Sequence, residues 1–396
     1  MATVQVGSRT WVVINSSRVA QELFVRRGAI TKERSHLPIA GELISRNQRL
    51  LWMNFNDWNP KRKVIHQLLT GTAITKYGEY QEIESTQLLA EYLLRPKQWY
   101  LHNFRFASSV INWITLGERV LQPSKTLLAV LRVVHAFVTY APPASLIDVL
   151  PQLAYLPKPL QWWRKKFETI GEETDKAFED YWLPIRQKID EGTASPSFAR
   201  DVLNSKDTTW KGSEKEKMFI VVQLIEAGSD TTRMNINIFV MAMLCYPEVL
   251  KRAQHELDSV CGTENIRLPV LADEKSMPYI CALIKELLRW RPIFPWTPDH
   301  VSTEIIEFEG YRFPQGTSFM INHLSIYQNP NEHKDPEKFL PERWLDGHES
   351  DIIHGLWSFG GGRRVCVGYR LAQKSLFIAI SCLAYCFNFT SVCPIT

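Results

Sequence analysis

The chain has 396 residues, of which 45% are hydrophobic and 22% are charged. These values are typical of a globular protein with a large core, and they exclude a disordered or fibrous chain. The formal net charge of +4 is too small to indicate a nucleic-acid partner.

Helical periodicity dominates the chain from its first quarter to its end. Apolar residues recur at helical spacing in segments 17–27, 60–70, 77–94, 104–116, 124–139, 159–192, 214–245, 246–260, 276–290 and 367–387. Strand-like alternation is confined to short segments at 10–14, 49–53, 304–308, 311–313 and 317–321. The proline-rich segment 142–158 is predicted to be a loop. No repeat or linker divides the chain, so the pattern predicts a single mainly α domain over residues 1–396.

An aromatic–basic pair lies near the start of the segment 60–70. Trp58 and Arg62 are four residues apart, a spacing that places two side chains on one helical face. However, Asn59-Pro60 has the form of an N-cap followed by proline, so the helix is expected to begin after Trp58. The alternative for Arg62 is a solvated member of the basic run 61–63.

Polar residues interrupt the long apolar segment 214–245. The sequence AGSDTT at 227–232 consists largely of poor helix formers, whose hydroxyl groups can compete for backbone carbonyls and open a helix locally. Asp230 and Thr231 form an acid–alcohol pair that could relay protons. The alternative is a kinked core helix with no catalytic part.

Two charged motifs follow. Glu286 and Arg289 share one face of segment 276–290, where such charges in an apolar setting need partners. Arg343 supplies a further positive charge. The alternative is an ordinary surface ion pair, which contributes little stability.

Cys366 lies between a glycine-rich stretch and the apolar segment 367–387. A helix N-terminus stabilises an anionic thiolate, the form of cysteine that binds metal. The glycines allow the backbone to approach a flat macrocycle, and their N–H groups can hydrogen-bond the sulfur. Arg364 suits the carboxylate of a haem propionate. The other cysteines are scattered without a CxxC pair, which argues against disulfides or zinc and favours a reducing compartment. The alternative for Cys366 is a buried structural cysteine.

The sequence around Cys366 resembles the haem-binding loop of cytochrome P450 monooxygenases, Phe-x-x-Gly-x-Arg-x-Cys-x-Gly. The matching residues are Phe359, Gly362, Arg364, Cys366 and Gly368. The other motifs occur in the family's order, so the resemblance covers nearly the whole chain. It implies the P450 fold, a helical bundle around haem b (iron protoporphyrin IX) with small β-sheets.

The resemblance also assigns roles to single residues. It makes Cys366 the iron ligand, Asp230 and Thr231 the catalytic acid–alcohol pair, and Glu286, Arg289 and Arg343 a structural triad. Contacts to the haem are expected from Trp58, Arg62, His300, Phe359, Gly362, Arg364 and Gly368. The alternative for His300 is a structural histidine. The substrate pocket is expected to be lined by residues 35–57, 219–226 and 292–296, which are apolar and aromatic.

The implied activity is insertion of one oxygen atom of O₂ into a lipophilic small molecule. Electrons would come from NADPH through NADPH–cytochrome P450 reductase, docked on a basic face of a monomeric enzyme. The residues expected to form that face are Lys61, Lys63, Arg363, Arg370 and Lys374. The sequence of residues 10–46 is similar to that of fungal microsomal P450s of secondary metabolism. The aromatic and basic stretch 162–166 could touch a membrane surface.

The sequence departs from the family at both ends. Eukaryotic members usually carry an N-terminal membrane helix and further C-terminal strands, and this chain is expected to lack both. The location is then the endoplasmic reticulum surface by resemblance, or the cytoplasm if the anchor is genuinely missing. Two alternatives remain open: a thiolate-haem isomerase or dehydratase that needs no external electrons, and a non-catalytic or degenerate P450 fragment.

Overall fold

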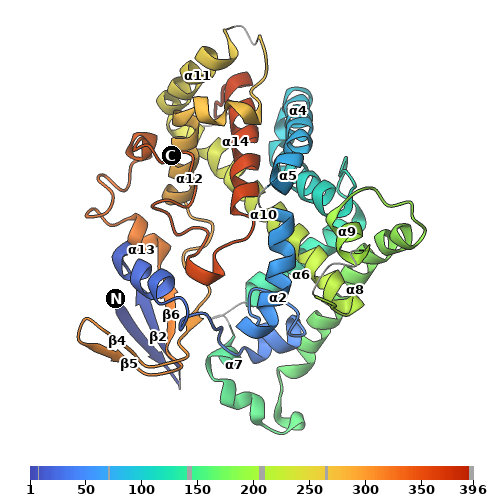
Figure 1. Ribbon diagram of the computed structural model, residues 1–396, viewed down its shortest axis with the longest axis vertical. Coiled ribbons are helices and arrows are strands. Elements are labelled where there is room, and N and C mark those ends of the chain that lie inside the picture. Colours follow the sequence, from blue (N-terminus) through green and yellow to red (C-terminus); the bar gives the residue numbers. More distant parts are fainter. Residues whose placement is uncertain (8, 70–71, 141–144, 205–209, 264–265, 392–396) are drawn as a thin grey trace.

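A computed structural model describes residues 1–7, 9–69, 72–140, 145–204, 210–263 and 266–391 (Figure 1). The end of the predicted helix at residue 70, part of the predicted loop at 142–144 and Cys393 lie outside these described residues. Within them, helices form most of the molecule and a small sheet lies at one corner, next to the N-terminus. The mainly α prediction is therefore confirmed.

The central helix of the molecule is α10, Glu214–Cys245. It starts at a capping box in which the Ser213 hydroxyl accepts from the Glu216 N–H. After its charged first turn, every side chain from Met218 to Ile225 except Gln223 is buried, as expected for a core helix. It packs closely on α5, Trp99–Leu116, because a β-carbon on Gly228 would stand only 2.7 Å from Ile111.

Most of the remaining helices lie around α10 and its neighbour α14, Tyr369–Cys386, whereas α13 lies beside the sheet (Figure 1). The α-helices are α1 Ser17–Ala20, α2 Phe55–Leu69, α3 Thr72–Lys76, α4 Gly78–Leu94, α6 Lys125–Tyr140, α7 Leu146–Val149, α8 Arg164–Asp190, α9 Phe198–Asn204, α11 Pro247–Cys261, α12 Pro278–Trp290 and α13 His323–Tyr327. Short 3₁₀ or π segments lie at Gln21–Arg26, Pro38–Ile44, Pro96–Gln98, Pro151–Tyr155, Lys158–Leu160, Leu271–Ser276, Pro341–Trp344 and Gly362–Arg364.

The main sheet has the strand order β1-β2-β6-β3. Its strands are β1 Ala2–Val6, β2 Arg9–Ile14, β6 Ser318–Ile321 and β3 His300–Val301. β2 and β6 are parallel, so the sheet joins the start of the chain to a segment three hundred residues later. A separate hairpin pairs β4, Ile306–Phe308, with β5, Tyr311–Phe313.

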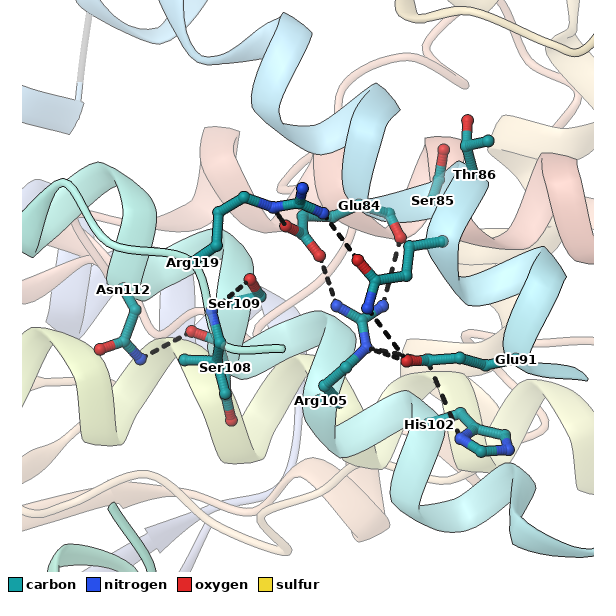
Figure 2. A network of polar contacts seen from close by, with 12 residues as sticks. Glu84, Ser85, Thr86, Glu91, His102, Arg105, Ser108, Ser109, Asn112 and Arg119 are labelled. Atoms are coloured by element: carbon teal, nitrogen blue, oxygen red, sulfur yellow. Dashed lines mark hydrogen bonds and ion pairs between the residues drawn. The ribbon is translucent and has the colours of Figure 1, made fainter. Parts of the chain in front are cut away.

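Buried charges hold α4 and α5 together. Figure 2 shows Arg105 between Glu84 and Glu91, with Arg119 joining Glu84 from the other side. The Arg105 Nε atom lies 2.8 Å from Glu91 Oε2, and all three of these central side chains are buried. Because each buried charge has an opposite partner, the network costs far less than the same charges would alone.

One predicted strand and one predicted loop are wrong. Residues 49–53 do not form a strand, because their backbone groups bond to side chains of other elements instead of a neighbouring strand. The described part of 142–158 is not a plain loop, since it contains α7 and two 3₁₀ turns. Strands β1 and β3 were not predicted at all.

Candidate active site around Cys366

The turn before Cys366 is shaped by glycines. Gly360 and Gly362 both have positive φ angles, 71° and 61°, which side chains rarely adopt. A β-carbon on Gly362 would lie 1.8 Å from the Phe24 carbonyl oxygen, so no other residue fits there. The Cys366 N–H then donates to the Phe359 carbonyl at 2.8 Å, which closes the turn.

Cys366 itself precedes the helix rather than starting it. α14 begins at Tyr369, two residues later than predicted, and Gly368 is its N-cap residue. Solvent reaches the Cys366 side chain, yet the surrounding protein raises the pKa of its thiol above the ordinary value. The Gly368 N–H and the charge of Arg62 act in the opposite direction. A coordinated metal ion would add the remaining stabilisation that the thiolate needs.

Arg364 is the second notable residue of the turn. Its Nε and Nη2 atoms donate to the carbonyls of Lys32 and Met53 at 2.8 and 2.9 Å. Its guanidinium lies over the Trp58 indole, 4.4 Å from the ring centroid. Burial lowers the pKa of Arg364 to about 9. The buried Nη1 atom has no partner among the described residues, so one strong donor is left for an anion.

Trp58 and Arg62 both belong to α2, which contradicts the predicted start after Trp58. The Glu33 carboxylate accepts the Phe55 N–H at 2.9 Å and satisfies a donor in the first turn, three residues before Trp58. Local sequence gives no sign of this contact from a distant residue. Arg62 donates through Nη2 to the Val365 carbonyl at 2.7 Å, next to Cys366. The structure thus brings Trp58, Arg62 and Arg364 to one side of the turn.

His300 lies in β3 and contacts the same region. Its Nδ1 atom donates to the Thr31 carbonyl at 2.8 Å, and its ring packs on Phe24 with centroids 4.3 Å apart. Burial, together with the charges of Arg34 and Arg364, lowers the pKa of His300 well below its ordinary value. The ring is therefore neutral, and Nε2 can act only as an acceptor.

The polar residues at 227–232 lie in the middle of α10, and the helix is continuous there. The predicted local opening is therefore wrong, although the Thr231 hydroxyl does compete for a carbonyl, donating to Ala227 O at 2.7 Å. Ala227 is exposed although it lies halfway along a core helix, and Thr231 is half-buried. This face of α10 is therefore open to solvent and to small molecules.

Asp230 forms an ion pair that its sequence motif did not predict. Its carboxylate accepts from Arg233, one turn further along α10. The Arg233 guanidinium in turn lies 5.1 Å from the centroid of the Tyr100 ring. The i,i+3 spacing of an acid and an arginine in one helix was the available signal for this contact.

The three residues of the proposed triad lie together in the core. Arg289 makes two hydrogen bonds of 2.8 Å to Glu286, and the Arg343 Nε atom donates to Glu286 at 3.2 Å. Trp344 also donates to Glu286, at 2.9 Å. Glu286 and Arg289 have no exposed surface, so the alternative of a surface ion pair is wrong.

A tyrosine links this triad to the Cys366 turn. Arg289 donates to the Tyr327 carbonyl at 2.8 Å, and the Tyr327 hydroxyl accepts the Trp357 N–H at 2.7 Å. The same hydroxyl lies 2.9 Å from the Ser358 hydroxyl, directly before the motif. Sequence reasoning missed Tyr327, which carries no motif of its own.

The structure also describes two further groups of residues singled out in the sequence, the basic face that included Lys61 and the stretch 219–226. Lys61 is buried and pairs with Glu216 at 2.8 Å, so it does not belong to a basic face, whereas Lys63, Arg363 and Arg370 are exposed. Of the stretch 219–226, every side chain except Gln223 is buried, and the apolar ones belong to the main core cluster. Among the described residues, no helix combines the length and apolarity that crossing a membrane requires.

Comparisons with known proteins agree with this geometry. The family profile described as Cytochrome P450 matches residues 1–393. Cytochrome P450 monooxygenase fogE of Aspergillus ruber is 32% identical over 98% of this chain and 74% of its own length. Cytochrome P450 monooxygenase virE of Hypocrea virens is 30% identical over 98% of this chain and 72% of its own.

Solved structures share the fold. A zebrafish cytochrome P450 with progesterone aligns with a TM-score of 0.78 over 96% of this chain and 87% of that chain, at 22% identity. The glycine turn, the buried triad, the profile match over almost all residues and the fungal monooxygenase relatives all agree. This chain therefore belongs to the cytochrome P450 family, and its activity class is that of the P450 monooxygenases.

Proposed function

We propose that this protein binds haem b through Cys366 and inserts one oxygen atom of O₂ into a lipophilic small molecule. The observation that carries the proposal is the buried, unpartnered Nη1 atom of Arg364 beside the Cys366 turn. A thiol, a glycine backbone and a free guanidinium donor together fit a haem with its thiolate bond and propionate. Haem bound there supplies the redox chemistry and the activation of O₂.

The residues around Cys366 are proposed to hold and tune the cofactor. The Gly368 N–H hydrogen-bonds the sulfur and lowers its pKa, and Arg62 adds a nearby positive charge. Arg364 offers Nη1 to a propionate, while the Trp58 indole ring packs against its guanidinium. His300 is proposed to line this site with an uncharged ring.

Thr231 and Asp230 are proposed to handle protons on the opposite side of the site. The Thr231 hydroxyl hydrogen is directed to Ala227 O, so the oxygen lone pairs remain to accept a hydrogen bond from the open face of α10. Asp230 pairs with Arg233 and is partly exposed, so its carboxyl group can exchange protons with solvent. The pair together can accept and pass on a proton.

Electrons are proposed to come from NADPH through a cytochrome P450 reductase. Lys63, Arg363 and Arg370 are exposed and Lys374 is half-buried, which gives a basic surface near the Cys366 turn that suits an acidic partner. We propose a monomer at the surface of the endoplasmic reticulum membrane. The support is a row of exposed apolar side chains ahead of the basic residues 164–166, namely Leu146, Tyr155, Leu160 and Trp162. The fungal relatives support a substrate from secondary metabolism.

The test is reconstitution of the purified protein with haem, NADPH and a fungal reductase in detergent or lipid. We expect NADPH-dependent O₂ uptake that is lost in Cys366→Ser. Haem binding without NADPH-driven uptake would favour the isomerase or dehydratase alternative. Failure to bind haem at all would favour the non-catalytic alternative.

A further inference from the structure

A buried ion pair joins α10 to the irregular segment 48–53. Arg49 donates to both carboxylate oxygens of Glu226, at 2.7 and 3.1 Å. The two side chains are 6% and 5% exposed and come from positions far apart in the sequence. Glu226 directly precedes Ala227, the exposed residue of the open face of α10.

Neighbouring groups stabilise the ion pair, yet one of its hydrogen-bond donors has no partner among the described residues. The Arg49 guanidinium lies 3.8 Å from the centroid of the Phe137 ring, which stabilises its charge. Burial raises the pKa of the Glu226 carboxyl, while Arg49 opposes that change. The Arg49 Nε atom is buried and has no partner among the described residues. Replacement of a buried ion pair by apolar residues of similar volume often leaves stability unchanged or raises it, so stability is not a sufficient reason for these charges.

A neighbouring glutamine also links α10 to the segment 48–53. Gln223, about one turn before Glu226, accepts the Leu50 N–H at 2.9 Å and donates to the Gln48 carbonyl at 2.9 Å. We call Arg49, Gln223 and Glu226 the α10 clamp. It fixes residues 48–50 to two positions of α10 that are about one helical turn apart.

The clamped segment continues directly to the cofactor side of the site. The Leu51 carbonyl accepts from Arg34 at 2.9 Å, and the Met53 carbonyl accepts from Arg364 at 2.9 Å. Arg364 is the residue whose free donor faces the proposed propionate. The segment 48–53 therefore spans from the open face of α10 to the arginine that would hold the cofactor.

We infer that the α10 clamp is a positioning and specificity device: it sets the distance between segment 48–53 and α10, and so limits the size of the ligands that reach the cofactor. The inference rests on the proposed haem site. It concerns Arg49 as a positioning residue, since the Arg49 side chain is buried and acts through Glu226.

The test compares Arg49→Met with Arg186→Met in the haem-loaded protein. Arg186 is the control because it also forms an ion pair with α10, at Glu214, but this pair is partly exposed and lies away from the segment 48–53. Hydrogen exchange of the backbone amides of residues 48–53 is expected to rise roughly tenfold in Arg49→Met and to stay unchanged in the control. The association rate of the bulky iron ligand clotrimazole should rise about tenfold, while that of imidazole changes by less than about twofold.

A double variant keeps the test valid if Arg49→Met folds poorly. Arg49→Met with Glu226→Leu leaves no unpaired buried charge, and it is expected to fold while still speeding clotrimazole binding relative to imidazole. Equal exchange in Arg49→Met and Arg186→Met would overturn the inference, as would faster exchange without any change in the two ligand rates. If the wild-type protein binds no haem, the proposed function fails, whereas the exchange measurement on the haem-free protein still decides whether the clamp fixes the segment.

Discussion

The carbonyl oxygen of Phe24 lies 1.8 Å from the point that a β-carbon on Gly362 would occupy. This contact presses the Cys366 turn against the segment Gln21–Arg26 near the start of the chain. Gly362 is thus required twice, by its φ of 61° and by the close approach of another backbone. Gly360 has a similar φ of 71°, but its nearest neighbour would be 3.9 Å away.

Substitution by alanine should therefore lower the free energy of unfolding by different amounts at Gly362 and Gly360. Gly362→Ala should destabilise the protein by more than about 3 kcal/mol, since the backbone of the turn must move. Gly360→Ala should cost about 1–2 kcal/mol, the price of the left-handed conformation alone. Denaturant unfolding of the two variants measures the difference, and equal losses would show that the Phe24 contact does not shape the turn.

Replacement of Arg364 is expected to weaken haem binding. Arg364→Met removes the only donor of this side chain that lacks a partner among the described residues, together with its contact over Trp58. We expect haem affinity to fall roughly 10-fold or more, as for other residues that support a metal site. Arg363→Met is the control, because Arg363 is the exposed neighbour. Haem titration followed by absorbance makes the comparison, and an undiminished affinity in Arg364→Met would contradict the assignment.

The triad predicts a large loss of stability. Glu286→Gln would leave Arg289 buried with no compensating charge, at a cost of about 3–5 kcal/mol. Glu309→Gln breaks an exposed pair with Arg18 and should cost less than about 1 kcal/mol. Unfolding free energies of the two variants test this contrast. Similar values would mean that the buried pair contributes no more than a surface one.

Asp148 predicts a dependence of stability on pH. Its carboxylate accepts the N–H groups of Ile39 and Ala40 at 2.7 and 3.1 Å. Burial raises the pKa of Asp148 from 3.8 to about 6, although these N–H groups, Arg9 and His36 oppose the shift. The folded protein thus holds this proton more tightly than the unfolded chain, so Asp148 makes the fold less stable as pH rises from about 4 to 6.

The matching experiment uses Asp148→Asn, which cannot ionise. Its stability relative to wild type should improve by roughly 2–3 kcal/mol between acidic and neutral pH, because each pKa unit corresponds to about 1.4 kcal/mol. A difference that stays flat over this range would contradict the raised pKa of Asp148.

Sequence periodicity was sufficient for the long elements. Core helices such as α10 and α12 carry enough apolar residues for their extents to be predicted almost to the residue. The motif residues Arg364, Cys366 and Glu286 were predicted because each has fixed neighbours in sequence. Errors arose where a contact from a distant segment decides the local structure. Glu33 starts α2 before Trp58, and Glu216 buries Lys61, and neither effect is visible in a local window.

The parts of the site that were missed share that cause. Arg49 lies in a segment that alternates like a strand, yet its partners are on α10 and its backbone neighbours bond to side chains. Tyr327 has no motif, and its role appears only when α13 is packed between the triad and the Cys366 turn. Tertiary contacts between segments far apart in sequence, rather than local propensity, set these positions.

The central claim is that the Cys366 thiolate holds haem iron. The most direct measurement is the absorption spectrum of the reduced, carbon monoxide-treated protein, for wild type and for Cys366→Ala. We predict a Soret band at the red-shifted position of a thiolate-ligated haem in the wild type, and no such band in the variant. An unshifted Soret band in the wild type, or an unchanged spectrum in Cys366→Ala, would contradict the claim.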